Sequence, residues 1–149
     1  MAGKRFSVRG SKRHGKGVFA LKPIKEGELI AQYKGMILEA EIAGIKHPTH
    51  ETGHTMLVAL GEKDGKEWVL DGTVNGNSMR FINHGCVPNC KLENVGMKVN
   101  VRAIRNIRVG QELLLDYQLS CSQRLSKAVK AAYKCLCGAR TCRGTMLAK

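Results

Sequence analysis

The chain has 149 residues, of which 43% are hydrophobic, and its 25 Lys and Arg outnumber its 12 Asp and Glu, giving a net charge of +13. This length suits a single domain with its own core, and the hydrophobic content excludes an intrinsically disordered chain. No stretch approaches the roughly 18 continuous apolar residues that a membrane span needs. No apolar stretch follows the basic residues at the start either, so we expect no secretory signal and an intracellular protein.

The positive charge is concentrated at the two ends of the sequence. Residues 1–25 contain eight Lys or Arg and no acid, and residues 118–149 contain seven and no acid. Basic ends favour an acidic partner, with nucleic acid as the first candidate. No DNA-binding motif accompanies the charge, so a generally basic, solvated surface is the alternative.

The first third of the chain predicts short strands between glycine turns. A glycine turn at residues 15–17 runs into an apolar strand, and residues 23–28 form a second turn. Residues 29–33 are apolar enough for another strand, which Lys34 and Gly35 interrupt. Short strands bounded by glycine are typical of a mainly β fold with few short helices.

The middle of the chain predicts a helix, a loop and a hairpin. Residues 39–45 are consistent with a short helix that ends before Pro48. The loop at residues 47–54 holds three histidines, which could bind a metal, although a solvated surface loop is the preferred interpretation. Residues 55–60 predict a buried strand, and residues 63–66 predict a hairpin turn into the strand that follows.

The last third predicts two strands and a helix. Residues 99–104 alternate apolar with polar side chains, as a half-buried strand does. Residues 113–115 form a buried apolar run. Residues 122–134 predict the best helix of the chain, because Leu125 and Val129 share one face while lysines lie outside it.

The densest signal lies at residues 80–90, which read RFINHGCVPNC. This segment combines side-chain hydrogen-bonding groups, thiols and a turn fixed by proline. A capped loop with no further role is the alternative interpretation. The segment resembles the signature RFINHSCxPNC of the SET-domain protein-lysine methyltransferase family, with Gly85 where serine is usual.

Other segments resemble the motifs of the same family in the same order. They read HGKGVF at residues 14–19, QYKG at 32–35, DGTVNGN at 71–77, GQELLLDY at 110–117, and CLCG followed by CRG between 135 and 144. The resemblance covers about residues 9–144. It implies a SET domain over residues 9–119, followed over 120–149 by a helix and a post-SET zinc-binding segment.

The resemblance implies a SET fold of several small sheets with a C-terminal pseudoknot. It also implies S-adenosylmethionine as methyl donor, S-adenosylhomocysteine as product, and a lysine side chain as acceptor. The cofactor-binding residues that it implies are His14, Lys16, Gly17, Val18, Arg80, Asn83 and His84. Gly15 and Gly17 would let the backbone approach the cofactor without a Cβ in the way. Because a strand follows these glycines, and not a helix, a Rossmann-type fingerprint is excluded.

The resemblance implies that Tyr117 is the catalytic tyrosine and that Tyr33 lines the lysine channel with it; a plain core tyrosine is the alternative for Tyr117. The attacking amine must be neutral, and the usual lysine pKa of about 10.4 leaves it mostly charged at pH 7. A desolvated channel beside a positive sulfonium favours the neutral form. Leu115, in the channel, stands where most family members have Phe or Tyr, so we expect di- or trimethyl-lysine as product. Relatives often place a cofactor-contacting tyrosine near residues 55–57, and this chain has none.

Six cysteines in an intracellular chain argue against a disulfide framework. Three closely spaced thiols in the tail suit a tetrahedral zinc site that lacks its fourth ligand: Cys135, Cys137 and Cys142. The resemblance supplies that ligand from Cys86, and Cys90 is the competing candidate. Cys121 fits no ligand pattern and is expected to be a buried thiol.

Charge and resemblance together predict the partners. The acids gather in the middle of the sequence, so we expect the centre to hold a basic protein such as a histone tail, while the basic ends contact DNA or a nucleosome. A eukaryotic protein of this kind would act in the nucleus on chromatin, and a bacterial one in the cytoplasm, at the nucleoid or as a secreted effector. The alternatives to an enzyme are a SET-like module that binds chromatin or nucleic acid without catalysis, and a zinc-dependent nucleic-acid-binding protein.

Overall fold

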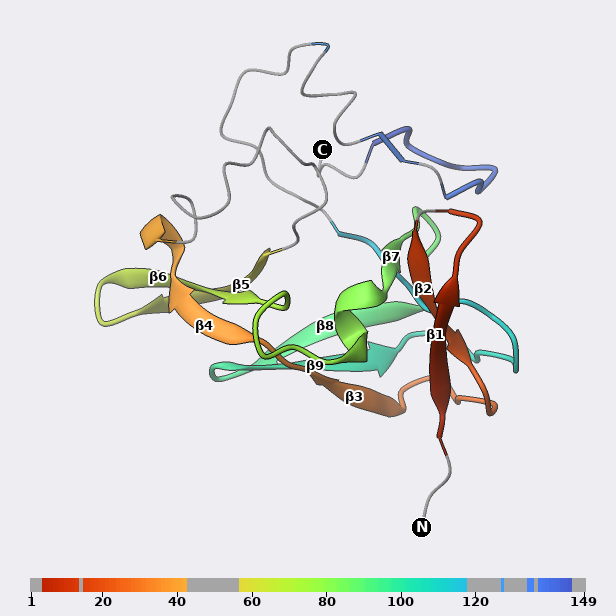
Figure 1. Ribbon diagram of the computed structural model, residues 1–149, viewed down its shortest axis with the longest axis horizontal. Coiled ribbons are helices and arrows are strands. Elements are labelled where there is room, and N and C mark those ends of the chain that lie inside the picture. The colour runs from red at the N-terminus through yellow and green to blue at the C-terminus, as the bar shows by residue number, and fades with distance from the viewer. Residues whose placement is uncertain are drawn as a thin grey trace.

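The computed structural model describes residues 4–13, 15–42, 57–117, 127, 134–135 and 137–145. Within these residues the chain forms mainly short strands, which assemble into three small sheets (Figure 1). The mainly β fold predicted from the glycine turns and short apolar runs is therefore confirmed. No helix in the described part of the chain is both long and apolar enough to cross a membrane.

The first sheet is a hairpin of β1 (Phe6–Gly10) and β2 (Lys16–Ala20). Its turn closes with a hydrogen bond from the Ser11 N–H to the Gly15 carbonyl, 2.8 Å long. Gly15 has a φ of +42°, which a residue without a Cβ adopts at little steric cost. A β-bridge to Glu112 ties β2 to a segment almost a hundred residues further on.

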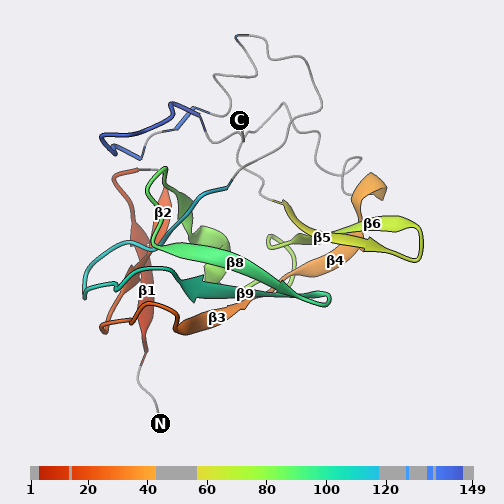
Figure 2. The same ribbon diagram turned by 180° about the vertical axis from the view of Figure 1, so that it is seen from behind.

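The second sheet has the strand order β3-β9-β8-β10-β7, and Figure 2 shows β3, β9 and β8 side by side. Its first three members are antiparallel: β3 (Leu29–Tyr33), β9 (Lys98–Ala103) and β8 (Cys90–Val95). β9 buries alternate residues, as predicted for a half-buried strand. The other two strands are only two residues long: β10 (Leu114–Leu115) runs parallel to both β8 and β7 (Asn83–His84).

The third sheet has the order β4-β6-β5 and is antiparallel throughout. Its strands are β4 (Met36–Glu39), β5 (Leu57–Lys63) and β6 (Lys66–Asp71). Asp64 and Gly65 join β5 to β6 with φ angles of 56° and 76°, the positive values of a tight two-residue hairpin turn. The predicted hairpin is confirmed, and it lies on the far side of the molecule from β1 and β2 (Figure 1).

A short 3-10 helix, η1 (Ser78–Phe81), leads from the third sheet into β7. Asn77 caps it, because its side-chain oxygen accepts the Met79 N–H at 3.3 Å. The Asn77 amide also donates to the Gln32 carbonyl on β3, at 2.8 Å. One side chain therefore fixes both the start of η1 and its position against the second sheet.

β10 lies between β7 and β8 and is hydrogen-bonded on both sides. The Gly85 N–H donates to the Leu115 carbonyl at 2.9 Å, and the Asn89 N–H donates to the Leu114 carbonyl at 3.2 Å. The Asn89 side chain holds the same segment, since its amide donates to the Glu112 carbonyl and its oxygen accepts the Leu114 N–H, each at 2.8 Å. The C-terminal segment thus passes through the loop between β7 and β8, which is the pseudoknot that the resemblance implied.

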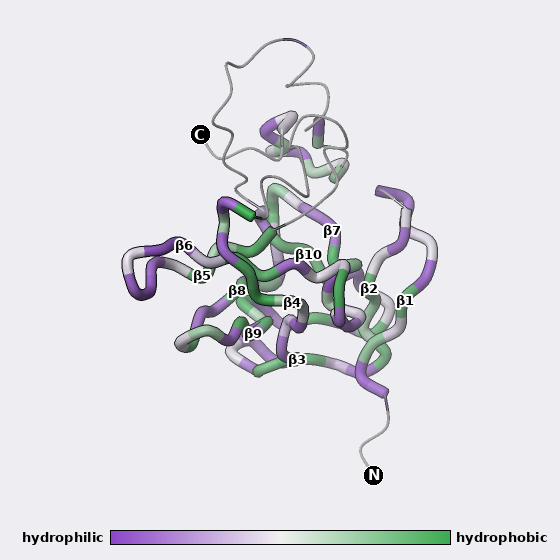
Figure 3. Tube along the Cα trace, turned by 60° about the vertical axis from the view of Figure 1, so that its left-hand side comes forward, coloured by the Kyte–Doolittle hydropathy of each residue, from purple (hydrophilic) through white to green (hydrophobic). Residues whose placement is uncertain are grey.

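The core consists mainly of aliphatic side chains from the first two sheets and from the crossing, the place where β10 lies between β7 and β8. Val18, Val99, Val101 and Leu113 are completely buried, and Tyr33 at the end of β3 packs with them. In Figure 3 hydrophobic and hydrophilic stretches alternate along the central strands, whereas the tip of the β5–β6 hairpin is hydrophilic. The interior is therefore built around the strands that meet at β7 and β10.

The helix predicted over residues 39–45 begins one residue late. Residues 40–42 are helical, but Glu39 belongs to β4, where it pairs with Trp68. The Glu39 carboxylate also accepts from Lys66 Nζ at 3.0 Å. Pairing with a neighbouring strand overrides the local helical preference at this position. The rest of the predicted helix and the histidine loop lie outside the described residues.

The predicted C-terminal helix also has a different boundary. Lys127 is helical, whereas Lys134 forms a β-bridge with Thr145, so the helix ends before Lys134. The other residues predicted in this helix lie outside the described part of the chain. The strand predicted over residues 55–60 is present from Leu57 onward and extends further, to Lys63.

Candidate functional site

Tyr117 lies just beyond β10, where the chain leaves the crossing. Its N–H donates to His84 Nδ1 at 3.0 Å, and its hydroxyl donates to the Ile82 carbonyl. The His84 and Tyr117 rings also meet edge to face, with their centroids 5.3 Å apart. β7 and the residue before it therefore hold this tyrosine both at its backbone and at its hydroxyl.

Tyr33 is buried, whereas Tyr117 is half-buried and packs against the core. Burial raises the pKa of Tyr33 to about 12. Burial, together with the nearby Tyr33 and Glu112, raises the pKa of Tyr117 well above its ordinary value. A tyrosine of ordinary pKa is already neutral at physiological pH, and burial extends that neutrality to higher pH for both hydroxyls. Gly72 leaves room for the first of them, because a Cβ there would lie 3.1 Å from the Tyr33 hydroxyl.

His84 is a buried, neutral histidine. Burial lowers its pKa, partly opposed by the nearby Asp116 carboxylate. Because Nδ1 accepts the Tyr117 N–H, the hydrogen-bond network assigns the ring proton to Nε2. Nε2 lies 3.5 Å from Cys86 Sγ. One imidazole thus connects the backbone of Tyr117 with a thiol in the loop after β7.

Asn83 and Glu112 form a buried polar pair between β7 and the β1–β2 hairpin. Asn83 Nδ2 donates to Glu112 Oε1 at 2.8 Å and to the Lys16 carbonyl at 2.9 Å. The Glu112 side chain is only 3% exposed, and it also accepts from the Ser11 hydroxyl at 2.9 Å and the Arg13 guanidinium at 2.8 Å. Both hydrogens of the Asn83 amide are thus donated within the protein.

Gly17 is close to the same carboxylate. A Cβ on Gly17 would overlap with Glu112 Oε1 and lie 3.1 Å from Ser11 Cβ, so no side chain fits there. The close approach that this glycine permits is to an acid of its own chain. An approach by a cofactor, the reason inferred from the sequence, stays a prediction.

Four cysteines meet beside the loop that follows β7: Cys86, Cys135, Cys137 and Cys142. Their sulfur atoms lie within 4.8 Å of one another, and Cys86 Sγ is 3.7 Å from Cys135 Sγ and 3.9 Å from Cys142 Sγ. Sulfurs bound to a tetrahedral zinc at about 2.3 Å are about 3.8 Å apart. The described tail, blue in Figure 1, therefore meets the loop after β7 that contains Cys86. The distances between the sulfur atoms are those expected of a zinc site with four thiolate ligands.

Cys90 lies apart from this cluster. It is 1% exposed in β8, its Sγ donates to Asn89 Oδ1 at 3.3 Å, and burial raises its pKa to about 12. A thiol held neutral in the core is a poor metal ligand. Of the two candidates for the fourth ligand, the fold brings only Cys86 to the tail cysteines. Cys121 lies outside the described residues.

Arg143 connects the tail with the crossing. Its guanidinium makes two parallel hydrogen bonds to the Asp116 carboxylate, at 2.8 and 2.9 Å, and its N–H donates to Cys86 Sγ at 3.3 Å. Such a bidentate pair fixes geometry as well as charge. Asp116 directly precedes Tyr117, so the cysteine cluster is linked to the tyrosine through Arg143 as well as through His84.

The remaining residues predicted for cofactor binding differ in their surroundings. Lys16 Nζ lies 5.4 Å and the Arg80 guanidinium 4.7 Å from the centroid of the Phe81 ring. Val18 is completely buried, and its carbonyl accepts the Leu113 N–H at 2.7 Å, so its side chain belongs to the core. His14 lies outside the described residues.

Leu115, the residue predicted for the channel, is 2% exposed and belongs to the hydrophobic core. It pairs with His84 on one side and Cys90 on the other. Glu112, in contrast, could not be identified as a site residue from the sequence. Its hydrogen-bond partner Ser11 is 101 positions away, and no local pattern marks a carboxylate as buried.

Small sheets joined by a pseudoknot, with Tyr117 and a cysteine cluster beside the crossing, define a fold of the SET type. The model of the SET domain family matches residues 15–118. The chain belongs to the SET domain family.

Curated relatives resemble the chain over most of its length. It is 33% identical to "Histone-lysine N-methyltransferase, H3 lysine-4 specific" of Schizosaccharomyces pombe, over 90% of the chain and 14% of the relative. It is 33% identical to "Histone-lysine N-methyltransferase ASHH2" of Arabidopsis thaliana, over 90% of the chain and 8% of the relative. It is 31% identical to "Histone-lysine N-methyltransferase 2B" of Homo sapiens, over 87% of the chain and 5% of the relative. The chain thus spans a small part of each of these longer proteins.

Proposed function

We propose that this chain is a protein-lysine methyltransferase, which transfers a methyl group from S-adenosylmethionine to a lysine of a basic protein such as a histone tail. The observation that carries the proposal is the position of Tyr117, whose backbone is held by His84 of β7 and whose hydroxyl is held by the Ile82 carbonyl, directly beyond the β7–β10 crossing. Membership of the SET domain family and the names of the relatives support it.

The site offers the conditions that such a transfer needs. S-adenosylmethionine supplies an electrophilic methyl group, and the lysine amine must reach it uncharged and in line. Burial around the two tyrosines disfavours the charged amine. The Tyr117 hydroxyl is proposed to orient the amine, with Tyr33 and Leu115 narrowing the channel. Positioning of this kind supplies most of the rate effect expected here.

The chemistry of the β2–η1 region fits the proposed cofactor. Lys16 and Arg80 flank the Phe81 ring, so cationic groups and an aromatic face lie together. These groups suit a ligand that carries both a carboxylate and an aromatic base. Gly17, Asn83 and His84 are proposed to complete this wall, with Val18 contributing its backbone. Cofactor binding by His14 stays a prediction from the sequence.

We further infer that the four clustered cysteines hold a structural zinc. Four thiolates close a tetrahedral site and leave no position for a substrate or a water, so a structural role is favoured over a catalytic one. The division of the chain into a SET domain over residues 9–119 and a zinc-binding segment over 120–149 stays part of this proposal.

Transfer of labelled methyl groups from S-adenosylmethionine to a histone mixture tests the proposed activity. Tyr117→Phe is the matched variant, because it keeps the buried ring and removes only the hydroxyl. We expect the wild-type chain to label a histone and the variant to be slower by roughly 10²-fold or more. A wild-type chain that binds S-adenosylmethionine but transfers nothing would favour the alternative, a SET-like module that binds chromatin or nucleic acid.

The distribution of charge supports a basic substrate. Glu39 lies on β4, where it pairs with Lys66, and Glu62, Asp64 and Glu67 lie on the β5–β6 hairpin beside Lys63, so acids outnumber basic residues on the third sheet. We propose that this sheet attracts the peptide while basic residues elsewhere contact DNA, which for a eukaryotic protein means work in the nucleus on chromatin. Activity should then be higher on nucleosomes than on free peptide and should fall steeply with salt. Equal activity on both substrates would count against the DNA contact.

A further inference from the structure

We infer that Glu112 is a positioning residue for the proposed methyl transfer, holding the turn between β1 and β2 and the Asn83 amide in one arrangement. This inference rests on the proposed function, because the wall that Glu112 holds is the one proposed to bind S-adenosylmethionine. Glu112 itself takes no part in the transfer chemistry. Its effect passes through the groups that it contacts.

Glu112 has more polar partners than a simple ion pair requires. Oε1 accepts from Asn83 Nδ2 at 2.8 Å and from the Ser11 hydroxyl at 2.9 Å, while Oε2 accepts from the Arg13 guanidinium at 2.8 Å. The side chain is 3% exposed, so its charge needs compensation within the protein. Arg13 provides the opposite charge, and the neutral donors occupy Oε1. Loss of the carboxylate would leave donors from two distant segments without their acceptor.

The same carboxylate occupies the space beside β2 that a side chain at position 17 would need. Oε1 lies where a Gly17 Cβ would be placed, and Asn83 Nδ2 also donates to the neighbouring Lys16 carbonyl at 2.9 Å. Three of the residues proposed to bind the cofactor, Lys16, Gly17 and Asn83, therefore meet around this one acid.

Two further observations link Glu112 with the turn between β1 and β2 and with Tyr117. The Ser11 hydroxyl that donates to Glu112 also accepts the Arg13 backbone N–H at 3.0 Å. This hydrogen bond lies within the turn between β1 and β2, and the carboxylate therefore holds that turn through Ser11. At the other end, Glu112 is one of the groups that raise the pKa of Tyr117. The charge of Glu112 therefore acts on the turn through hydrogen bonds and on Tyr117 through its electrostatic field.

Glu112→Gln tests the inference, because it keeps the shape of the side chain and removes its charge. A glutamine nitrogen cannot accept, so at least one of the present donors loses its partner. We expect the Kd for S-adenosylhomocysteine, measured by calorimetry on folded protein, to rise about tenfold or more, as for a hydrogen bond to a charged group. The matched control is Glu93→Gln, which removes the ion pair with Arg102 at 2.5 Å on β8 and should leave this Kd unchanged.

A second pair of variants separates positioning from direct cofactor contact. Gly17→Ala should weaken binding in the wild-type background, where the new Cβ meets Glu112 Oε1, and should weaken it much less in a Glu112→Ala background. An equal loss in both backgrounds would mean that Gly17 serves the cofactor directly, and it would overturn the inference. If Glu112→Gln does not fold, Ser11→Ala removes one donor hydroxyl and should still raise the Kd about two- to fivefold.

The outcomes distinguish this inference from the proposed function. A Glu112→Gln variant that is less stable but binds with the wild-type Kd shows a purely structural acid and overturns the inference alone. A wild-type chain that binds neither S-adenosylmethionine nor its product overturns the proposed function and the inference with it.

Discussion

Leu115 is the residue at which side-chain size bears most directly on the proposed product. It is 2% exposed, and it lies in β10 two positions before Tyr117. Leucine adds no hydroxyl that could hold a water in the channel, and it is smaller than the aromatic residues usual in the family. In the proposed channel, a lysine that already carries a methyl group would therefore have more space to rotate and react again.

We expect the wild-type chain to form di- or trimethyl-lysine, and Leu115→Phe to shift the product toward monomethyl-lysine. Mass spectrometry of the substrate after long reaction times measures both. The larger ring has a cost of about 1–3 kcal/mol in a filled core, so a thermal melt must accompany the assay. A wild-type chain that stops at monomethyl-lysine would contradict this view of the channel.

Single residues differ in how far the sequence predicts them. Tyr117 and Cys86 lie in segments whose composition is unusual, so they could be singled out, and the fold brings Cys86 to the tail cysteines as expected. Glu112 could not be singled out, because its burial depends on Ser11 and Asn83, which only the folded chain brings to it. The acid beside Gly17 could not be foreseen for the same reason.

At the scale of elements, the contact between Gly85 and Leu114 governs how β10 crosses β7. A Cβ on Gly85 would lie 2.9 Å from Leu114 Cδ1 and 3.1 Å from Leu114 Cβ. The first atom can move with its side chain, but the second is fixed to the strand. A side chain at position 85 would therefore overlap with a leucine on the inserted strand.

Gly85→Ser should lower the free energy of unfolding by about 1–3 kcal/mol, through overpacking at the crossing. The same substitution should cost less in a Leu114→Ala background, since residues in contact show such coupling. Urea denaturation of the two single variants and the double variant measures it. Gly10→Ser is the control, because nothing lies within 4 Å of a Cβ at that position. Equal costs in both backgrounds would exclude a steric origin.

Elements that are determined by neighbouring residues in the sequence could be predicted. Elements that depend on pairing with a segment far along the chain could not. The β5–β6 hairpin follows from Asp64 and Gly65, and β9 follows from its own alternation. The parallel insertion of β10 has no local signature and came only from the resemblance. The two misplaced helix ends have the same origin, because Glu39 and Lys134 each pair with a segment beyond their own neighbours in the sequence.

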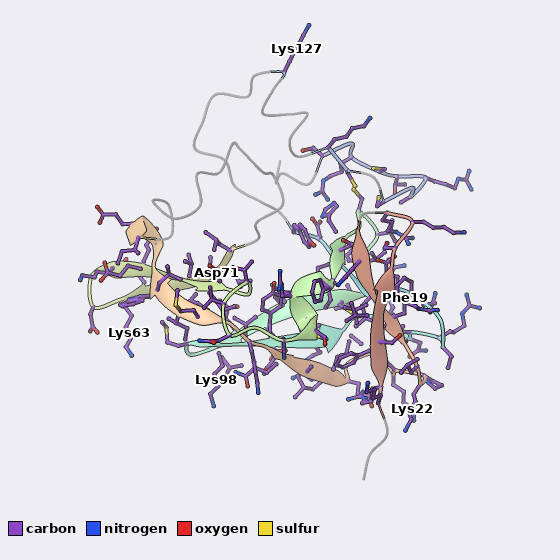
Figure 4. The ribbon with its side chains drawn as sticks, in the orientation of Figure 1. Phe19, Lys22, Lys63, Asp71, Lys98 and Lys127 are labelled. Atoms are coloured by element: carbon purple, nitrogen blue, oxygen red, sulfur yellow. The ribbon has the colours of Figure 1, made fainter. Side chains whose placement is uncertain are left out.

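At the scale of the whole molecule, charge is distributed unevenly between its ends. The β5–β6 hairpin carries Glu62, Asp64 and Glu67 around Lys63, which Figure 4 labels at its tip, whereas Lys22 lies at the opposite end near β1. A β-bridge between Ile24 and Ile107 brings together two basic loops, one with Lys22 and Lys25 and the other with Arg105 and Arg108. These two loops form the surface that we expect to contact DNA.

Replacing Lys25 and Arg108 with glutamine should weaken binding to a DNA duplex and flatten its salt dependence. For each phosphate that the variant no longer neutralises, the slope of log K against log salt should fall by about 0.9. Fluorescence anisotropy over a salt series measures this slope. Lys63→Gln with Lys66→Gln on the opposite sheet is the matched control and should change it little. Equal slopes for both double variants would indicate general attraction without a preferred surface.

Removal of zinc should abolish methyl transfer before it unfolds the core. The proposed metal ligands reach the tyrosine by two routes, through His84 and through the Arg143–Asp116 pair, whereas the main sheets do not depend on them. A strong chelator or Cys137→Ser should therefore reduce activity at temperatures where circular dichroism is still native. Zinc-free protein with full activity would contradict this prediction.

Arg143→Lys tests the connection through Asp116 while leaving the connection through His84 unchanged. It keeps the charge but loses the paired hydrogen bonds to Asp116, which a lysine cannot reproduce. We expect one zinc per chain to be retained, by elemental analysis, while kcat falls. The readouts thus distinguish loss of the metal from loss of its connection to the crossing.

The insertion of β10 also bears on the order of folding. Tyr117 and His84 are 33 positions apart and come together only when a late segment of the chain enters between two earlier ones. Contacts between residues so far apart in the sequence form slowly, because a long loop must close first. The β8–β9 hairpin can form without these contacts. Pulsed hydrogen exchange during refolding should therefore find the Gly85 and Asn89 amides protected after those of β8 and β9. A partly folded or unfinished chain would then hold most of its sheets and still lack a reactive centre.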